Sequence, residues 1–257
     1  MYAKLHEIFA DKVGGEVFAC FGIYHFVYLA TFFSVLFFLI FYLRNKEKSV
    51  QKKAVRTVIT IAFCFYMADF FLMPFAYGEI DIDKLPFHAC TLMCIMGFWS
   101  RYNKFLSKYT LQFTLIGLIS NMIYVVCPMG VASYAIHPLS YRAVQTLGFH
   151  GIMVIYSILA LIYDDFKLEL KKCYRELALL CIMAAWAIIG NTLYSGSAGD
   201  YSHDFNWFFV NSDPFGILPK SISPYVMPFV TVITFFLANI FIYAVCFGIK
   251  KLNKKDK

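Results

Sequence analysis

The chain has 257 residues, of which 60% are hydrophobic and only 15% are charged, and its mean hydropathy is +0.65. A soluble globular domain is nearer half apolar and a quarter charged, so the composition excludes an ordinary soluble protein and indicates a polytopic membrane protein. The net charge of +7 does not by itself indicate a nucleic-acid partner, because most of the basic residues fall in short loops.

Hydropathy predicts an all-α fold, a transmembrane helical bundle of seven spans. About 20 apolar residues cross the bilayer core as a helix. The predicted spans cover residues 21–43, 57–75, 85–100, 109–127, 141–163, 177–194 and 225–249. We expect no cleavable signal, because residues 1–20 have no apolar core, and residues 3–13 show only a weak pattern of an interfacial helix. An outer loop at 195–224 and a basic tail at 250–257 complete the predicted organisation.

Loop charge alternates between the two sides of the predicted bundle. Most of the 23 basic residues follow the first, third, fifth and seventh spans. The other side holds Lys4, Lys12, Lys84, Arg142 and Lys220. The positive-inside rule then places the N-terminus outside and the C-terminus in the cytoplasm. The basic loops are expected to touch anionic lipid headgroups, and we expect no nucleic-acid partner.

Polar side chains gather at one depth, in the outer halves of the predicted spans. They are His25, Asp69, His88, Cys90, Asn121, Gln145, His150, Asn191 and Tyr194. The inner halves contain almost nothing comparable. Ionisable groups inside membrane segments usually face a cavity, a partner or a site, so the common depth indicates a shared outer pocket. The alternative is that these groups are hydrogen bonds between helices, each contributing only about 0.6 kcal/mol.

The segment from Leu85 to Cys90 offers a potential base and a potential nucleophile two residues apart. Residues two apart on a helix point to nearly opposite sides, so His88 and Cys90 cannot form a dyad if the helix is regular there. Either Pro86 keeps the backbone turning at His88, or a histidine of another span serves Cys90. By depth, His150 is the first candidate and His25 the second.

Activation of Cys90 depends on such a partner. Cys90 is expected just past the first helical turn, where the helix dipole fades, and a thiolate needs an imidazole or a helix N-terminus to stabilise it. Without one, Cys90 is a small buried hydrophobic residue.

No metal or cofactor is expected. The chain contains no phosphate-binding loop, dinucleotide fingerprint, G-x-S-x-G or H-E-x-x-H motif. The spacing of His88, Cys90 and Cys94 is unlike that of zinc sites. A metal could bind the Asp200, His203 and Asp204 patch, but a solvated loop is the simpler interpretation. Cys20 and Cys127 both fall near the outer boundary and could pair, although sequence does not decide pairing.

Several of these motifs resemble the YwaF-like family of bacterial integral membrane proteins. The matching residues are Leu85-Pro86-Phe87-His88-Ala89-Cys90, Gly148-Phe149-His150-Gly151, Gly190-Asn191, Asn206-Trp207-Phe208-Phe209, Asp213-Pro214 and Pro224-Tyr225. More distantly, the chain is similar to eukaryotic polytopic lipid acyltransferases and lipid ester hydrolases, which use an intramembrane Cys or Thr with a His. The resemblance implies Cys90 as the acyl-accepting nucleophile and His150 or His88 as the base. It also implies that the protein lies in a bacterial plasma membrane.

Three functions are carried forward from the sequence. The first is an acyltransferase or acyl hydrolase acting on membrane lipids, in which Asn121, Asn191 or backbone N–H groups stabilise the oxyanion and Asp69 orients a histidine or binds a headgroup. The second is a transporter or small-molecule receptor with an outward-facing polar pocket, although charged gates are missing from the inner half. The third is a non-catalytic accessory membrane protein.

Overall fold

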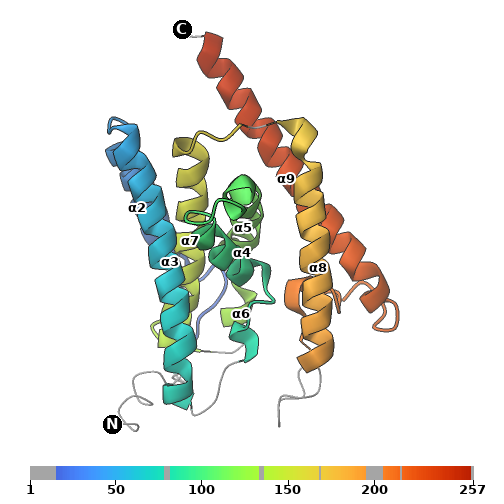
Figure 1. The fold of residues 1–257 in the computed structure, drawn as a ribbon. Coiled ribbons are helices and arrows are strands. Elements are labelled where there is room, and N and C mark those ends of the chain that lie inside the picture. Colours follow the sequence, from blue (N-terminus) through green and yellow to red (C-terminus); the bar gives the residue numbers. More distant parts are fainter. Residues whose placement is uncertain are drawn as a thin grey trace.

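The computed structural model describes residues 16–77, 82–132, 136–167, 169–194, 205–214 and 216–255, and every α-helix or 3-10 helix considered below lies within them. The predicted all-α fold is confirmed for these residues, which contain no β-strand (Figure 1). The α-helices are α2 (Ile23–Leu43), α3 (Lys48–Tyr77), α4 (Ala89–Trp99), α5 (Thr110–Val126), α6 (Met129–Ala132), α7 (Tyr141–Tyr163), α8 (Tyr174–Tyr194) and α9 (Ser223–Lys255). The expected interfacial helix at 3–13 and the Asp200 to Asp204 patch lie outside the described residues.

Six helices of the described part are long and apolar enough to cross a membrane: α2, α3, α5, α7, α8 and α9. The remaining predicted span, the third at 85–100, contains only the 11-residue α4. At 1.5 Å per residue α4 is about 16 Å long, against about 30 Å for the hydrocarbon core. The count of seven spans is therefore not confirmed, and the sides of the two termini, which depend on that count, stay predictions.

The start of α4 explains why it is shorter than its apolar run. A short 3-10 turn at Ile82–Lys84 is followed by Leu85, whose helical conformation is disfavoured by the proline after it. His88 is still extended, with φ −75° and ψ 142°, and the first helical hydrogen bond runs from Leu92 N to His88 O. The helix thus begins three residues beyond Pro86.

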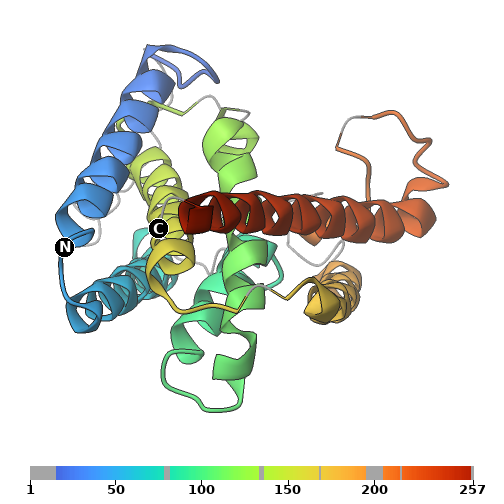
Figure 2. The same ribbon diagram turned by 90° about the horizontal axis from the view of Figure 1, so that it is seen from above.

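Three layers are visible along the bundle. Figures 1 and 2 show α2 and α3 on one side, α8 on the other, and α4, α5 and α7 between them, with the long α9 inclined to α8. The α2–α3 loop, the α7–α8 loop and the C-terminal end of α9 all lie toward the upper end in Figure 1. These are basic segments, so the charge pattern read from the sequence corresponds to one end of the molecule, called here the basic end.

Small residues allow the central helices to approach closely. A Cβ on Gly97 of α4 would lie 3.5 Å from Ile59 of α3 and 3.6 Å from Tyr156 of α7. A Cβ on Gly117 of α5 would lie 3.3 Å from Cβ of Met93. Small residues at helix contacts are the usual means by which membrane helices gain packing energy, because lipid provides little hydrophobic drive between helices.

Candidate functional site

Cys90 lies in the first turn of α4, at its second helical residue. The expectation that it lies just past that turn is wrong, because the helix starts at Ala89 rather than near Leu85. The backbone N–H groups of Cys90 and Thr91 lie close enough to the Cys90 sulfur to favour its charged form. A helix N-terminus carries partial positive charge and stabilises an anion. These N–H groups favour a thiolate at Cys90, whereas burial of the sulfur opposes one more strongly, so activation still depends on a base.

The N-terminus of α4 is not capped by a side chain. His88 is the N-cap residue, and its imidazole makes no capping hydrogen bond. The first three N–H groups of a helix have no partner within it. Among the described residues, those of Cys90 and Thr91 face only the sulfur, which is a weak acceptor. These groups could receive a carbonyl oxygen that gains negative charge.

His150 of α7 is held by Asn121 of α5. Its Nδ1 lies 2.7 Å from Asn121 Oδ1, and its ring stacks on Tyr124 with centroids 3.9 Å apart. Asn121 Nδ2 donates to Gly117 O at 2.7 Å, which fixes the orientation of the amide. Because Oδ1 can only accept, Nδ1 of His150 carries the proton and Nε2 keeps its lone pair. Both residues are buried.

The register of the three central helices places Cys90 at the level of this pair. A Cβ added at Gly117 of α5 would lie 3.3 Å from Met93 Cβ of α4 and 3.8 Å from Met153 Cε of α7. Cys90 precedes Met93 by three residues, His150 precedes Met153 by three, and Asn121 follows Gly117 by four. Residues three or four apart share a helix face, one turn along. Because α4 and α7 begin at the end opposite the basic end and α5 ends there, Cys90, His150 and Asn121 all lie on the side of Gly117 that faces that end.

His88 is the other predicted base. Its extended backbone removes the geometric objection that applies to a regular helix, so the first of the two alternatives, a turning backbone at His88, describes the structure. Its imidazole lies edge-on to Trp207, with centroids 6.4 Å apart, and interacts electrostatically with His150. Both histidines thus lie near the start of α4.

A buried ion pair beside this region was missed by the sequence reasoning. Lys84 Nζ lies 2.7 Å from Asp69 Oδ2, and the Asp69 side chain is completely buried. Lys84 also donates to Gln145 Oε1 at 3.4 Å. Its charge acts on His88, Cys90 and His150. The sequence feature that could have predicted the pair is Lys84, four residues before His88, together with Asp69 at the same predicted depth.

His25 does not serve Cys90. Its Nδ1 accepts from Phe21 N at 3.0 Å, and its Nε2 lies 2.9 Å from Val125 O, to which it must donate. Both ring nitrogens are therefore used by the backbone, and His25 connects the start of α2 to the end of α5. This leaves His150 and His88 as the possible bases.

An aromatic stack covers the start of α4. Trp207 stacks on Phe87 at 4.8 Å and on Phe205 at 4.5 Å, and Phe87 stacks on Trp186 of α8 at 4.9 Å. The Tyr194 ring packs edge-on against Trp207, with the ring centroids 5.8 Å apart. Tyr194 therefore belongs to the packing around the site.

Asn191 fixes the stack through the backbone of Trp207. Its Oδ1 accepts from Trp207 N at 3.0 Å, and its Nδ2 donates to Trp207 O at 3.3 Å. Phe208 and Phe209 follow with φ of 57° and 53°, a conformation that non-glycine residues rarely adopt. The amides of Asn191 and Asn121 both have hydrogen-bond partners, and their predicted role as oxyanion donors stays a prediction.

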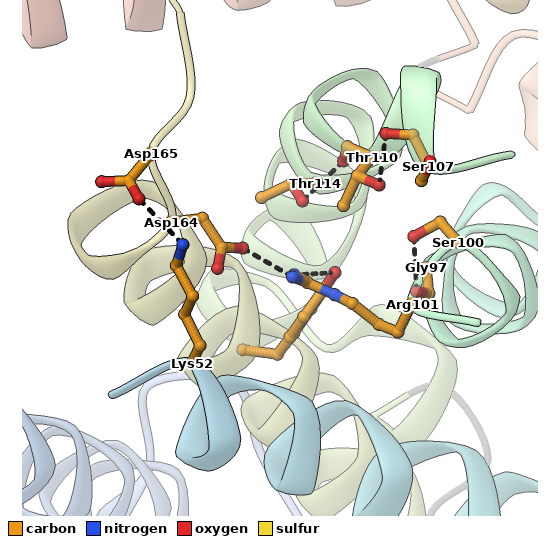
Figure 3. Close-up of polar contacts among 10 residues, drawn as sticks. Lys52, Gly97, Ser100, Arg101, Ser107, Thr110, Thr114, Asp164 and Asp165 are labelled. Atoms are coloured by element: carbon orange, nitrogen blue, oxygen red, sulfur yellow. Dashed lines mark hydrogen bonds and ion pairs between the residues drawn. The ribbon is translucent and has the colours of Figure 1, made fainter. Parts of the chain in front are cut away.

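The basic end also contains buried polar groups, which lie just beyond the inner ends of the predicted spans. Arg101 Nη1 lies 2.7 Å from Asp164 Oδ2, and its Nη2 donates to Tyr156 OH at 2.8 Å. Figure 3 shows Arg101 pointing from the α4 end toward Asp164 at the end of α7. Glu176 of α8 is completely buried and accepts from Gln112 and Tyr243. All three charged residues lie just outside the predicted spans 85–100, 141–163 and 177–194.

Two cavities also lie at the basic end. One, of about 500 Å³, is lined by Lys52, Lys53 and Arg56, and the other, of about 190 Å³, by Lys108, Lys172 and Arg175 among others. Neither is lined by Cys90 or His150. Beside them, hydrogen bonds from Lys48 and Lys52 lower the pKa of Asp165 to about 2 (Figure 3 shows the Lys52 contact).

Comparison with known proteins identifies the family. The model of the TMEM164 family matches residues 20–249, which is most of the chain. The chain belongs to the TMEM164 family. No curated protein and no solved structure matches it. The match to TMEM164, a membrane protein family, together with the six apolar helices, makes this a multi-pass membrane protein. The resemblance to YwaF-like proteins and to acyltransferases stays a prediction, as does the bacterial plasma membrane.

The matched range of the TMEM164 family includes every residue of the candidate site. It begins at Cys20, before α2, and ends in the last third of α9. The site described above is therefore part of the region that the family model covers, and it is assembled from α3, α4, α5, α7 and α8.

Proposed function

We propose that this TMEM164-family protein is a membrane-embedded acyltransferase or acyl hydrolase that carries an acyl chain from a membrane lipid on Cys90 as a thioester. The single observation that carries the proposal is the position of the Cys90 sulfur on the N–H groups of Cys90 and Thr91, at the uncapped start of α4. Nucleophile and oxyanion donors then belong to the same helical turn.

His150 is the proposed base. The hydrogen bond to Asn121 leaves the lone pair on Nε2, which is the nitrogen that a base needs. A Cys, a His and an Asn that orients the His also occur together in papain-like proteases, on an unrelated fold. The comparison concerns roles alone, and here the three residues would come from α4, α7 and α5.

The reaction would proceed in two balanced steps. The Cys90 proton moves to His150 Nε2, the sulfur attacks the ester carbonyl carbon, and the oxyanion is held by the N–H groups of α4. The carbon–oxygen bond of the ester breaks, and the departing alcohol takes the proton from His150. Water or the hydroxyl of a second lipid then loses its proton to His150, attacks the thioester and releases Cys90 as the thiol.

The proposal is tested by trapping the thioester. Purified protein in nanodiscs is incubated with a phospholipid whose ester-linked acyl chain ends in an alkyne, and covalent label that hydroxylamine removes is quantified. Wild type should be labelled and Cys90→Ala should not. Cys94→Ala is the matched control, because Cys94 is one turn deeper on the same helix, and it should label like wild type.

Two further results bear on the proposal. His150→Ala should slow labelling by about 100-fold, the lower range for loss of a general base. In cells, wild type should change the phospholipid acyl profile relative to Cys90→Ala. Label that persists in Cys90→Ala, or identical lipid profiles for wild type, Cys90→Ala and His150→Ala, would contradict the proposal.

A transporter remains the second candidate, because buried ion pairs lie toward both ends of the bundle. Asp69 pairs with Lys84 near the start of α4, and Arg101 pairs with Asp164 at the basic end. Paired charges that open alternately are one way to gate a path. Reaction with a thiol reagent discriminates the two functions. An activated Cys90 should react faster than Cys173, which is also partly exposed, whereas a transporter does not require this.

A further inference from the structure

Two cysteines about 100 residues apart in the sequence lie in contact at the end opposite the basic end. Cys20 precedes α2, and Cys127 is the C-cap residue of α5. Cys127 lies close enough to Cys20 to act on its thiol directly. Cys127 is exposed and Cys20 is partly exposed, so reagents can reach the pair. Neither residue has a role in the proposed acyl transfer.

The contact is built by His25. One ring nitrogen accepts from Phe21 N at 3.0 Å, and the other donates to Val125 O, which lies 2.9 Å away. Phe21 is the neighbour of Cys20, and Val125 is two residues before Cys127. A single, completely buried imidazole therefore holds the two stretches of backbone at a fixed separation.

A second anchor lies on the other side of Cys20. Phe18 N donates to Ile136 O at 2.9 Å, and the Phe18 ring is almost completely buried against Val131, Ile136 and neighbouring residues. Phe21 itself has φ 61°, a strained conformation that its hydrogen bond to His25 helps to hold. Cys20 is thus fixed from both sides, which is the preorganisation that a crosslink requires.

We propose that Cys20 and Cys127 form a disulfide in the mature protein, introduced by the disulfide of a thiol–disulfide oxidoreductase. The accessible Cys127 loses its proton and attacks the oxidant's disulfide, which releases one of its sulfurs as a thiol. Cys20 then loses its proton and attacks the Cys127 sulfur, which releases the second. Two protons and two electrons pass from the cysteine pair to the oxidant, whose disulfide becomes two thiols.

The bond would attach α2 to the core of the bundle. Much of α2 faces outward, with large exposed side chains such as Phe26, Phe38 and Phe41. In a membrane these surfaces contact lipid and add little to helix packing. The hydrogen bonds and the disulfide at the start of α2 would therefore contribute more to holding α2 against the bundle than they would in a helix packed on all sides. Burial and the adjacent Cys127 also raise the pKa of Cys20, so Cys20 is the resolving thiol and Cys127 the attacking one.

Alkylation mass spectrometry tests the proposal. Iodoacetamide is added to intact cells, the protein is purified and unfolded under fresh iodoacetamide, and its mass is measured with and without prior reduction. Wild type without reduction should carry two alkyl groups fewer than its eight cysteines allow, and all eight after reduction. Digestion should give one linked peptide pair that contains Cys20 and Cys127.

The variants make the assignment specific. Cys20→Ser and Cys127→Ser should each be alkylated at every remaining cysteine without reduction. Cys173→Ser, a change on the α7–α8 connection at the basic end, should still be two alkyl groups short of full alkylation. Full alkylation of unreduced wild type, or a linked peptide with a different cysteine, overturns the proposal, and this measurement needs no variant to fold.

Discussion

Substitution of Gly190 by alanine tests how α8 supports the start of α4. A Cβ on Gly190 would lie 2.4 Å from Cδ1 and 2.6 Å from Cγ of Phe87, well inside van der Waals contact. The ring has little room to turn, because it is stacked between Trp186 at 4.9 Å and Trp207 at 4.8 Å. Overpacking a filled core costs about 1–3 kcal/mol, and the roughly 1 kcal/mol by which alanine favours a helix offsets only part of it.

We therefore expect Gly190→Ala to lower the free energy of unfolding by up to about 2 kcal/mol. At about 2–4 °C per kcal/mol for a chain of this size, the melting temperature should fall by several degrees. Thermal unfolding in detergent, followed by tryptophan fluorescence, measures this. Gly248→Ala is the matched control, because no atom lies within 4 Å of its added methyl group, and its melting temperature should be unchanged or higher.

A double variant separates the clash from a general effect of alanine. Phe87→Leu removes the ring that the methyl group added at Gly190 would meet, so the two changes should be less harmful together than the sum of the single changes, by about 0.5–3 kcal/mol. If Gly190→Ala melts at the same temperature as Gly248→Ala, or if the two changes are additive, then Phe87 does not pack on Gly190 as described.

The remaining predictions concern three polar contacts. Asn121→Leu removes the acceptor that orients His150, so thioester labelling of Cys90 should slow by about 100-fold, and an unchanged rate would exclude the assigned role. Arg101→Met leaves the buried Asp164 unpaired and should lower the free energy of unfolding by about 3–5 kcal/mol, measured by thermal unfolding. The double variant Arg101→Met with Asp164→Leu should regain most of this stability. The pKa of Asp165 is about 2 rather than 3.8, so its ion pairs stabilise the fold above pH 4 and are lost as the pH falls toward 2. Carboxyl-carbon NMR should show this titration, and Lys52→Gln should move it upward, since Lys52 supplies one of the two hydrogen bonds.

Hydropathy predicted the long helices well and the short one poorly. The fifth predicted span, 141–163, agrees with α7 at both ends, because its apolar residues fill a helix that starts at a serine cap. The third run is 16 residues long in the sequence, yet α4 starts only at Ala89. An apolar count does not register the backbone constraint that Pro86 imposes, nor that the turn before α4 is sheltered by protein.

Charged residues were the harder part of the site to predict. Lys84 and Arg101 are predicted as loop charges, and Glu176 falls just before the sixth predicted span, because position relative to an apolar run was the only guide to their depth. The structure buries Glu176 and pairs Lys84 with Asp69. Whether a charge at the end of a span turns inward depends on a partner from another helix, and a single sequence does not show that partner. Depth alone did, however, bring His150 and Asn121 together correctly.

The non-helical turn before α4 brings the structural and chemical arguments together. Backbone at membrane depth must have its polar groups satisfied by protein. Tyr66 of α3 donates to Lys84 O at 2.7 Å, and Trp186 of α8 donates to Pro86 O at 2.9 Å. Flanking helices thus supply donors to the carbonyls of this turn, while the N–H groups of Cys90 and Thr91 face only a sulfur. A fold that satisfies the carbonyls and leaves these donors to a weak acceptor retains hydrogen-bonding capacity where the proposed reaction develops negative charge.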